Sequence, residues 1–260
     1  MRRFLRIASI IAATAFTSAG IIEADAQNDY WRQRVSLFEK LPVQPGDIVF
    51  LGNSITDGGE FQELLDREDV KNRGIVGDVI SGVRKRLGQV TSGHPSRIFL
   101  LIGINDVSHG LSARQIADRY AELVSEIREA TPNTILYVQS VLPINNDFRR
   151  YKNLFGREGV IPELNEMLRE ISSEQGAVYV DLWPLFADPQ TGKMKRELTS
   201  DGLHLSGEGY KTWAKAIRPL IGSAPENREV TIDEEERDAI EVTPEEEPTS
   251  PLPKVSKIER

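Results

Sequence analysis

The sequence contains no cysteine, which excludes disulfides, a lipidated cysteine anchor and a cysteine nucleophile. It is also poor in histidine, with three among 260 residues, and no cluster of His, Asp and Glu resembles a set of metal ligands. No basic patch of the kind that binds nucleic acid is present. We therefore expect no metal, no cofactor and no nucleic-acid partner.

Strongly apolar runs long enough to span a membrane are also lacking. Residues 7–22 are apolar but diluted by Ser, Thr and Gly, whereas a spanning helix needs about 20 strongly apolar residues. Three arginines precede this run, and Ala24-Asp25-Ala26 follows it as a small-x-small cleavage site. We predict a signal peptide over residues 1–26, export to the periplasm or the medium, and no stable membrane insertion after cleavage. A membrane anchor is the alternative.

Charge is distributed unevenly along the chain. The net charge is −8, and residues 223–260 alone carry −7 through 12 acidic and 5 basic side chains. This segment also holds five prolines and no aromatic residue, so it cannot bury enough apolar surface to offset its chain entropy. We predict a folded domain over residues 27–222 followed by a disordered acidic tail over 223–260. The sequence does not indicate an oligomeric state.

Short apolar runs alternate with amphipathic stretches through the predicted domain. The runs are rich in Ile, Val and Leu on both faces, which is typical of parallel strands covered by helices. Strands are predicted over 47–51, 97–102, 134–141 and 177–182, with a weaker one over 69–72. Helices are predicted over 29–40, 60–67, 79–90, 113–130, 160–174 and 206–221. This alternation predicts an α/β fold with a parallel sheet.

Polar residues that could support nucleophilic catalysis follow the predicted strands. Ser54 comes directly after the first strand, where it could either cap a helix or act as a nucleophile. A serine hydroxyl needs a base within hydrogen-bond reach, and His204 has Asp201 three residues before it to orient its ring. Because the carboxyl ends of parallel strands share one rim, we expect these side chains to meet there.

An oxyanion formed by attack on an ester needs preorganised donors as well. The candidates are the backbone N–H groups of Gly77 and Ser54 and the side-chain amide of Asn105. Taken singly, Gly77 could be a helix entry capped by Asp78, Asn105 a turn residue, and the Asp201–His204 pair a loop hydrogen bond. The occurrence of all of them in chain order on one rim favours catalysis.

Four short motifs resemble the conserved blocks of the SGNH (GDSL-type) hydrolases. They are Gly52-Asn53-Ser54-Ile55-Thr56, Gly77-Asp78, Gly103-Ile104-Asn105-Asp106 and Asp201-Gly202-Leu203-His204. The resemblance covers about residues 47–221. It implies a three-layer α/β/α sandwich with a flavodoxin-like, five-stranded parallel sheet of order 2-1-3-4-5.

The same resemblance implies roles for individual residues. Ser54 would be the nucleophile, His204 the base, Asp201 its orienter, and Ser54, Gly77 and Asn105 the oxyanion-hole donors. Asn53 departs from the named motif, which has Asp there. Residues 72–78 and 140–143 are similar to the branch with platelet-activating-factor acetylhydrolase-like and carbohydrate O-acetylesterase-like members.

The stretch after the fourth predicted strand, residues 145–157, is polar, cationic and interspersed with aromatics. A lipid site would be apolar, so this stretch favours a small acyl group, acetyl above all, on a sugar or other polar alcohol. Asn53, Asn145, Arg149 and Tyr151 are the predicted substrate-binding residues, and a solvated loop is the alternative. A lysophospholipase, a thioesterase and a non-catalytic glycan-binding protein on this fold are the competing hypotheses.

Overall fold

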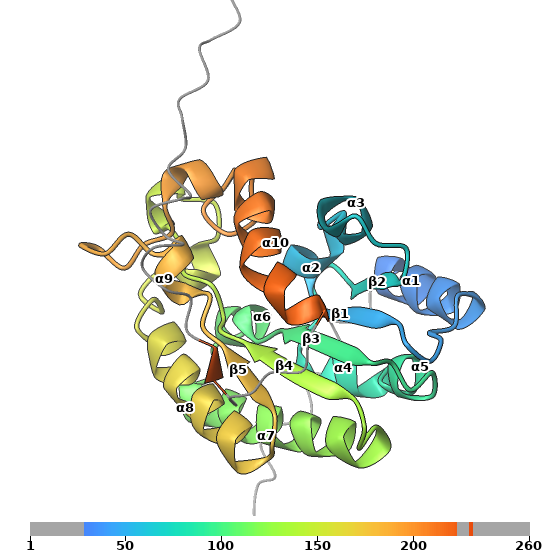
Figure 1. Cartoon of the computed structure of the whole chain (residues 1–260). Coiled ribbons are helices and arrows are strands. Elements are labelled where there is room, and N and C mark those ends of the chain that lie inside the picture. Colours follow the sequence, from blue (N-terminus) through green and yellow to red (C-terminus); the bar gives the residue numbers. More distant parts are fainter. Residues whose placement is uncertain (1–28, 223–228, 231–260) are drawn as a thin grey trace, which may run out of the picture.

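The computed structural model describes residues 29–222 and 229–230 (Figure 1). In this part of the chain one sheet has the order β2-β1-β3-β4-β5-β6, and every neighbouring pair is parallel. The strands are β1 (Ile48–Gly52), β2 (Val70–Gly74), β3 (Arg97–Leu101), β4 (Ile135–Gln139), β5 (Val178–Val180) and β6 (Glu229–Val230). The predicted α/β fold with strand order 2-1-3-4-5 is confirmed, and β6 extends the sheet by one short strand.

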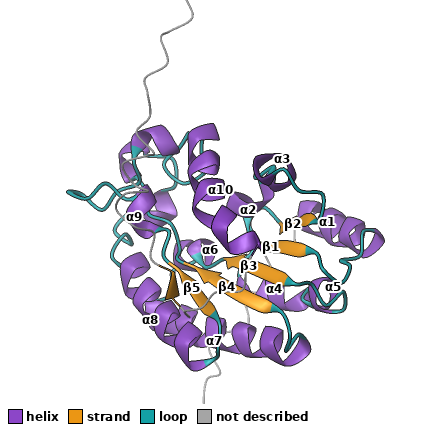
Figure 2. Ribbon diagram, in the orientation of Figure 1, coloured by secondary structure: helices purple, strands orange, loops and turns teal. Residues whose placement is uncertain are grey.

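Helices cover both faces of this sheet, which gives the three layers visible in Figures 1 and 2. Helices α4, α7 and α8 lie on one face, and α3 and α10 lie on the other. No helix in the described residues is long and apolar enough to cross a membrane. The helices are α1 (Asp29–Lys40), α2 (Ser54–Asp57), α3 (Phe61–Leu65), α4 (Ile80–Lys85), α5 (Gly88–Thr91), α6 (Ile104–Ser108), α7 (Ala113–Ala130), α8 (Val160–Glu174), α9 (Trp183–Phe186) and α10 (Gly207–Gly222), with 3-10 turns η1 (Asn146–Phe148), η2 (Lys152–Leu154) and η3 (Arg196–Leu198).

Two predicted segments lie mostly outside the described residues. The predicted signal peptide, 1–26, lies wholly outside them, so it stays a prediction. Of the predicted tail, 223–260, only β6 is described, and it pairs with β5 through Tyr179↔Glu229 and Val180↔Val230.

The ends and the buried face of helix α7 follow directly from its sequence. Its N-terminus is closed by a capping box, in which the Ser112 hydroxyl accepts from the Gln115 N–H and the Gln115 side chain accepts from the Ser112 N–H. Its apolar residues recur every three or four positions, and this stripe is buried against the sheet and α8. The helix therefore begins and ends where its sequence pattern places it.

An aromatic ladder forms the core beneath α3 and α10. Phe50, Phe99 and Tyr137 occupy matched positions on β1, β3 and β4, and their rings stack with centroids 5.0 and 4.4 Å apart. Phe61 stacks on Phe50 at 4.0 Å, and Trp213 meets Phe61 edge-on at 4.9 Å. All five side chains are buried, so this ladder anchors both covering helices to the three central strands.

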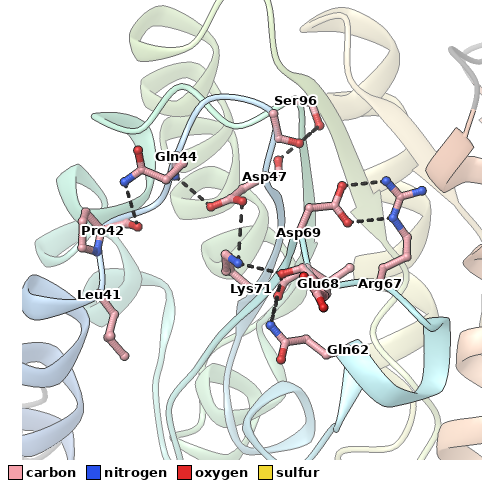
Figure 3. A network of polar contacts seen from close by, with 12 residues as sticks. Leu41, Pro42, Gln44, Asp47, Gln62, Arg67, Glu68, Asp69, Lys71 and Ser96 are labelled. Carbon is pink, nitrogen blue, oxygen red and sulfur yellow. Dashed lines mark hydrogen bonds and ion pairs between the residues drawn. The ribbon is translucent and has the colours of Figure 1, made fainter.

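The exposed edge of the sheet, at β2, is closed by side chains instead of another strand. Gln62 Nε2 donates to the Val70 carbonyl at 2.9 Å, and Asn72 Oδ1 accepts from the Gly74 N–H at 2.8 Å. Figure 3 shows the polar network at the start of this strand, where Lys71 Nζ reaches the Glu68 carbonyl at 2.8 Å and the Asp47 carboxylate at 3.8 Å. These contacts occupy groups that an edge strand otherwise leaves open to pairing.

The carboxyl ends of the strands form one rim, and the chain reverses its direction of winding between β1 and β3. Such a switch point is where open α/β sheets bind ligands. Gly52 ends β1 there, and a Cβ on it would lie 2.3 Å from both the Leu101 carbonyl and Thr56 Oγ1. Only glycine therefore allows α2 to start so close to β3.

Candidate active site

Ser54 is the first residue of α2, at the end of β1. Asn53 caps this short helix, because its Oδ1 accepts from the Ile55 N–H at 3.0 Å. The Gly58 N–H donates to the Ser54 carbonyl at 3.1 Å and closes the turn. Asn53 and not Ser54 therefore caps the helix. Ser54 is half-buried and lines a cavity, where its hydroxyl can meet a ligand.

Three side chains form a hydrogen-bonded row at this point. His204 Nε2 lies 2.9 Å from Ser54 Oγ, and His204 Nδ1 lies 2.8 Å from Asp201 Oδ2. The other carboxylate oxygen, Oδ1, accepts from the backbone N–H of His204 at 2.8 Å and of Leu203 at 3.0 Å. The backbone of the loop from 201 to 204 therefore orients the Asp201 carboxylate, and the carboxylate orients the imidazole ring of His204.

Asp201 is held in its ionised form by these neighbours. Burial alone would raise its pKa, but hydrogen bonds from Tyr151, from the His204 side chain and from the backbone of His204 and Leu203 outweigh burial and lower the pKa to about 2. The carboxylate is therefore charged at every pH at which the protein would normally work.

Tyr151 joins this row from the loop that follows β4. Its hydroxyl donates to Asp201 Oδ2 at 2.6 Å and lies 2.9 Å from His204 Nδ1. The ring packs edge-on against the imidazole with centroids 5.6 Å apart. Burial and the bond to Asp201 both raise the pKa of the Tyr151 phenol, which keeps it protonated as the donor.

Gly77 and Asn105 line the same cavity as Ser54 and His204. Gly77 has φ +77°, a left-handed conformation that favours glycine, in the loop between β2 and α4. Asn105 Nδ2 donates one hydrogen bond to the Asp78 carbonyl at 2.8 Å, which orients the amide and leaves its second N–H available. Both residues line the cavity together with Ser54.

A buried ion pair supports this side of the rim. Arg86 Nε lies 2.8 Å from Asp78 Oδ2, and Arg86 Nη2 donates to the Gly52 carbonyl at 3.1 Å. Trp31 Nε1 of α1 donates to Asp78 Oδ1 at 3.2 Å. Burial raises the pKa of Asp78 and lowers that of Arg86, and the attraction between the two charges opposes both shifts. The pair therefore links the end of β1 to the loop that carries Gly77.

Asp106, next to Asn105, makes a second link between the same loops. Its Oδ2 accepts from the Ile80 N–H at 3.2 Å, at the start of α4. The side chain is buried, and burial raises its pKa to about 7, although the bond from Ile80 partly offsets the rise. Asn105 and Asp106 therefore both hold the β3 loop against the β2 loop.

These groups open into a cavity of about 450 Å³. Its lining combines apolar side chains with polar and cationic residues of the loop after β4. The lining residues are Ser54, Val76, Gly77, Asn105, Ser108, Arg150, Tyr151, Lys152, Asn153, Leu154, Leu203 and His204.

A model of the GDSL-like lipase/acylhydrolase family matches residues 50–212. The chain belongs to this family. The match runs from the strand before Ser54 into helix α10, so it includes the hydrogen-bonded row and also Gly77 and Asn105.

Relatives of this GDSL-like family member include acetylhydrolases. Human platelet-activating factor acetylhydrolase IB subunit alpha1 is 26% identical over 184 residues, which cover 67% of this chain and 75% of the human protein. A structure of a candidate platelet activating factor from Streptococcus pneumonia is 26% identical with a TM-score of 0.67, covering 75% of this chain and 92% of that one. An acetylxylan esterase from Geobacillus stearothermophilus shares the fold at 19% identity and a TM-score of 0.56, covering 70% and 96%.

In this GDSL-like family member Ser54, His204 and Asp201 form one hydrogen-bonded row, and Gly77 and Asn105 line the same cavity as Ser54. Of the four predicted substrate-binding residues, only Tyr151 lines the cavity. Asn53 is fully buried as the cap of α2, and Arg149 is exposed outside the cavity. Asn145 is buried with its Nδ2 on the Met194 carbonyl at 2.8 Å. Neither asparagine points into the cavity.

The sequence did not predict two features of the site, the burial of Arg86 and the contact between Tyr151 and Asp201. Arg86 stands in the basic stretch Arg84-Lys85-Arg86, where nothing local marks one arginine as buried. The contact of the Tyr151 hydroxyl with Asp201 joins residues 50 positions apart, so no spacing rule could have found it. Among the described residues, no three His, Cys, Asp or Glu side chains gather in a way that could hold a metal ion.

Proposed function

We propose that this chain is a serine ester hydrolase that removes a small acyl group, acetyl above all, from a sugar or other polar alcohol. The observation that carries the proposal is the row from Ser54 Oγ through His204 to Asp201, with contacts of 2.9 and 2.8 Å. Membership of the GDSL-like lipase/acylhydrolase family supports the reaction class. The acetyl preference draws support from relatives named as acetylhydrolase and acetylxylan esterase, and the polar alcohol from Arg150, Lys152 and Asn153 in the cavity lining.

In the first half of the proposed reaction, Ser54 Oγ attacks the ester carbonyl carbon while His204 Nε2 takes the hydroxyl proton. The carbonyl electrons move onto oxygen, which faces the N–H groups of Ser54, Gly77 and Asn105. The bond to the alcohol then breaks, and His204 returns the proton to the departing alkoxide. This leaves the acyl group on Ser54.

In the second half, water attacks the acyl-Ser54 ester and gives a proton to His204. The bond from the acyl carbon to Ser54 Oγ breaks, and His204 returns the proton to Oγ. The carboxylic acid leaves, and the side chains are restored. The charged Asp201 stabilises the imidazolium in both halves.

The direct test compares p-nitrophenyl acetate with p-nitrophenyl octanoate, using the full chain after export and its Ser54→Ala variant. Acetate turnover that is lost in the variant, with an unchanged thermal melt, is the expected result. A preference for octanoate would favour the lysophospholipase or thioesterase alternative instead. Turnover of acetate that survives Ser54→Ala would contradict the proposal.

Export from the cell by residues 1–26 remains part of the proposal on sequence grounds alone. The proposed reaction uses only side chains and backbone N–H groups of the described domain. An inert Ser54 in an intact fold would leave a glycan-binding role as the alternative function.

A further inference from the structure

Two cations at the cavity mouth have no ion-pair partner among the described residues. Arg150 and Lys152 line the same cavity as Ser54, and both are exposed. Within the part of the chain that the structure describes, neither makes an ion pair or a side-chain hydrogen bond. Other cations near this loop are engaged, since Lys193 pairs with Asp147 at 2.8 Å and Arg196 lies over the Phe148 ring at 4.5 Å.

Hydrogen bonds hold the backbone around these two cations close to the row of Ser54, His204 and Asp201. Tyr151 stands between them in the chain, and its hydroxyl is bonded to Asp201 at 2.6 Å. Leu154 is buried, and its carbonyl accepts from Asn146 Nδ2 at 3.1 Å. The two cations that line the cavity therefore stand on a backbone held by hydrogen bonds, which lowers the entropic cost of binding a ligand.

Their position indicates which part of an ester they would meet. In the proposed reaction His204 gives its proton to the departing alkoxide, so the alcohol part must lie on the His204 side of the cavity. The Tyr151 hydroxyl lies 2.9 Å from His204 Nδ1, so Tyr151 lies on that side of the cavity. Arg150 and Lys152, which flank Tyr151, thus border the space for the alcohol.

We propose that the alcohol part of the substrate carries an anionic group, a carboxylate or a phosphate, which Arg150 and Lys152 bind. This inference rests on the proposed esterase function and names its substrate class more closely. Guanidinium and ammonium groups both form charge-assisted hydrogen bonds with such anions. The net charge of the whole chain is −8, so two cations that line the same cavity as Ser54 are a local feature of that cavity.

The test uses acetyl esters of phenols whose meta substituent is either anionic or neutral. They are 3-acetoxybenzoate, its neutral methyl ester and 3-acetoxyphenyl phosphate. We expect the wild-type chain to prefer an anionic ester over the neutral one by about five- to tenfold in kcat/KM at low salt, as two partly exposed ion pairs allow. The preference should shrink in 0.5 M NaCl because salt screens exposed charges. The anionic ester with the higher kcat/KM shows whether the site favours a carboxylate or a phosphate.

Variants assign the preference to the two cations. In the double variant Arg150→Gln/Lys152→Gln the ratio of anionic to neutral ester should fall to about one. Arg149→Gln is the matched control, because it removes one positive charge from the same loop outside the cavity, and it should keep the wild-type ratio. Thermal melts of all three proteins check that the loop variants fold.

Three results would overturn the inference. Wild-type turnover without preference for either anion, or a preference that persists in the double variant, would leave the esterase proposal intact and remove the anion site. No turnover of any ester and no labelling of Ser54 by a fluorophosphonate would instead remove the esterase proposal and this inference with it. If Ser54 is labelled but turnover is too slow to compare, protection from labelling by 3-hydroxybenzoate against its methyl ester gives the same ratio.

Discussion

The two sides of the candidate active site are held in opposite ways. The proposed oxyanion side, at the ends of β1, β2 and β3, is held by buried charged groups, with Arg86 on Asp78 and Gly52 and with Asp106 on Ile80. The mouth loop, residues 145–157, exposes its cations and reaches the row of Ser54, His204 and Asp201 through the Tyr151 hydroxyl. Buried charge fixes the geometry that the reaction needs, whereas exposed charge is free to meet a substrate. Changes on the first side should therefore cost far more than changes on the second.

The largest effect is expected from Arg86→Ala. Removing this cation leaves the Asp78 carboxylate buried without its counter-charge, which costs about 3–5 kcal/mol of unfolding free energy. Arg84→Ala is the matched control, because Arg84 lies two residues before Arg86 and pairs with Glu122 and Glu126 at the surface, where such pairs contribute about 0–1 kcal/mol. Denaturant titrations give both values. Equal losses in the two variants would mean that burial of the charge does not set its contribution to stability.

Asn105→Ala tests the oxyanion side through activity. Loss of one donor to the developing oxyanion should lower kcat by about 10²- to 10³-fold. The variant also loses the bond to the Asp78 carbonyl, so its melt should fall slightly, by the cost of about one hydrogen bond. Steady-state kinetics on p-nitrophenyl acetate measure the effect. A kcat within threefold of wild type would show that Asn105 only shapes the loop.

Asp106→Asn addresses the pH dependence of the buried side. Because the folded state raises the pKa of Asp106 to about 7, folding favours the protonated carboxyl, and stability falls as pH rises from the ordinary Asp range through 7. The amide cannot ionise, so the variant should lose this dependence and gain stability at pH 8, on the order of 1–3 kcal/mol. Thermal melts at pH 5 and pH 8 compare the two proteins. Identical pH slopes would mean that Asp106 does not titrate as described.

Tyr151→Phe probes the point where the mouth loop reaches the row. The variant keeps the ring against His204 but removes the donor to Asp201, so kcat should fall about tenfold while KM changes little. The rate at which a fluorophosphonate labels Ser54 should fall in parallel, since that reaction needs His204 and no bound alcohol. A rise in KM at constant kcat would instead assign Tyr151 to substrate binding alone.

Local chemistry made much of this structure predictable. Helix 113–130 follows from its apolar stripe and the Ser112 cap, and the strands follow from short runs that are apolar on both faces. Ser54, Gly77, Asn105, Asp201 and His204 could be nominated because parallel strands place their carboxyl ends on one rim. Motif order along the chain was enough to group them.

Long-range contacts account for what the sequence did not reveal. The predicted helix 79–90 is divided into α4 and α5, and the break falls at Arg86, whose side chain turns inward to Asp78. Asn145, expected to face a substrate, is instead turned inward to the Met194 carbonyl. In both cases a distant partner outweighs the local pattern, and no residue spacing encodes such a partner.

The central claim is that Ser54 is a nucleophile activated by His204. The most direct measurement is covalent labelling by a fluorophosphonate, mapped by mass spectrometry in the wild-type chain and in His204→Ala. We predict one adduct per wild-type chain, on Ser54, and labelling at least 100-fold slower in the variant, as loss of a general base implies. No adduct on Ser54, or equal labelling of both proteins, would contradict the claim.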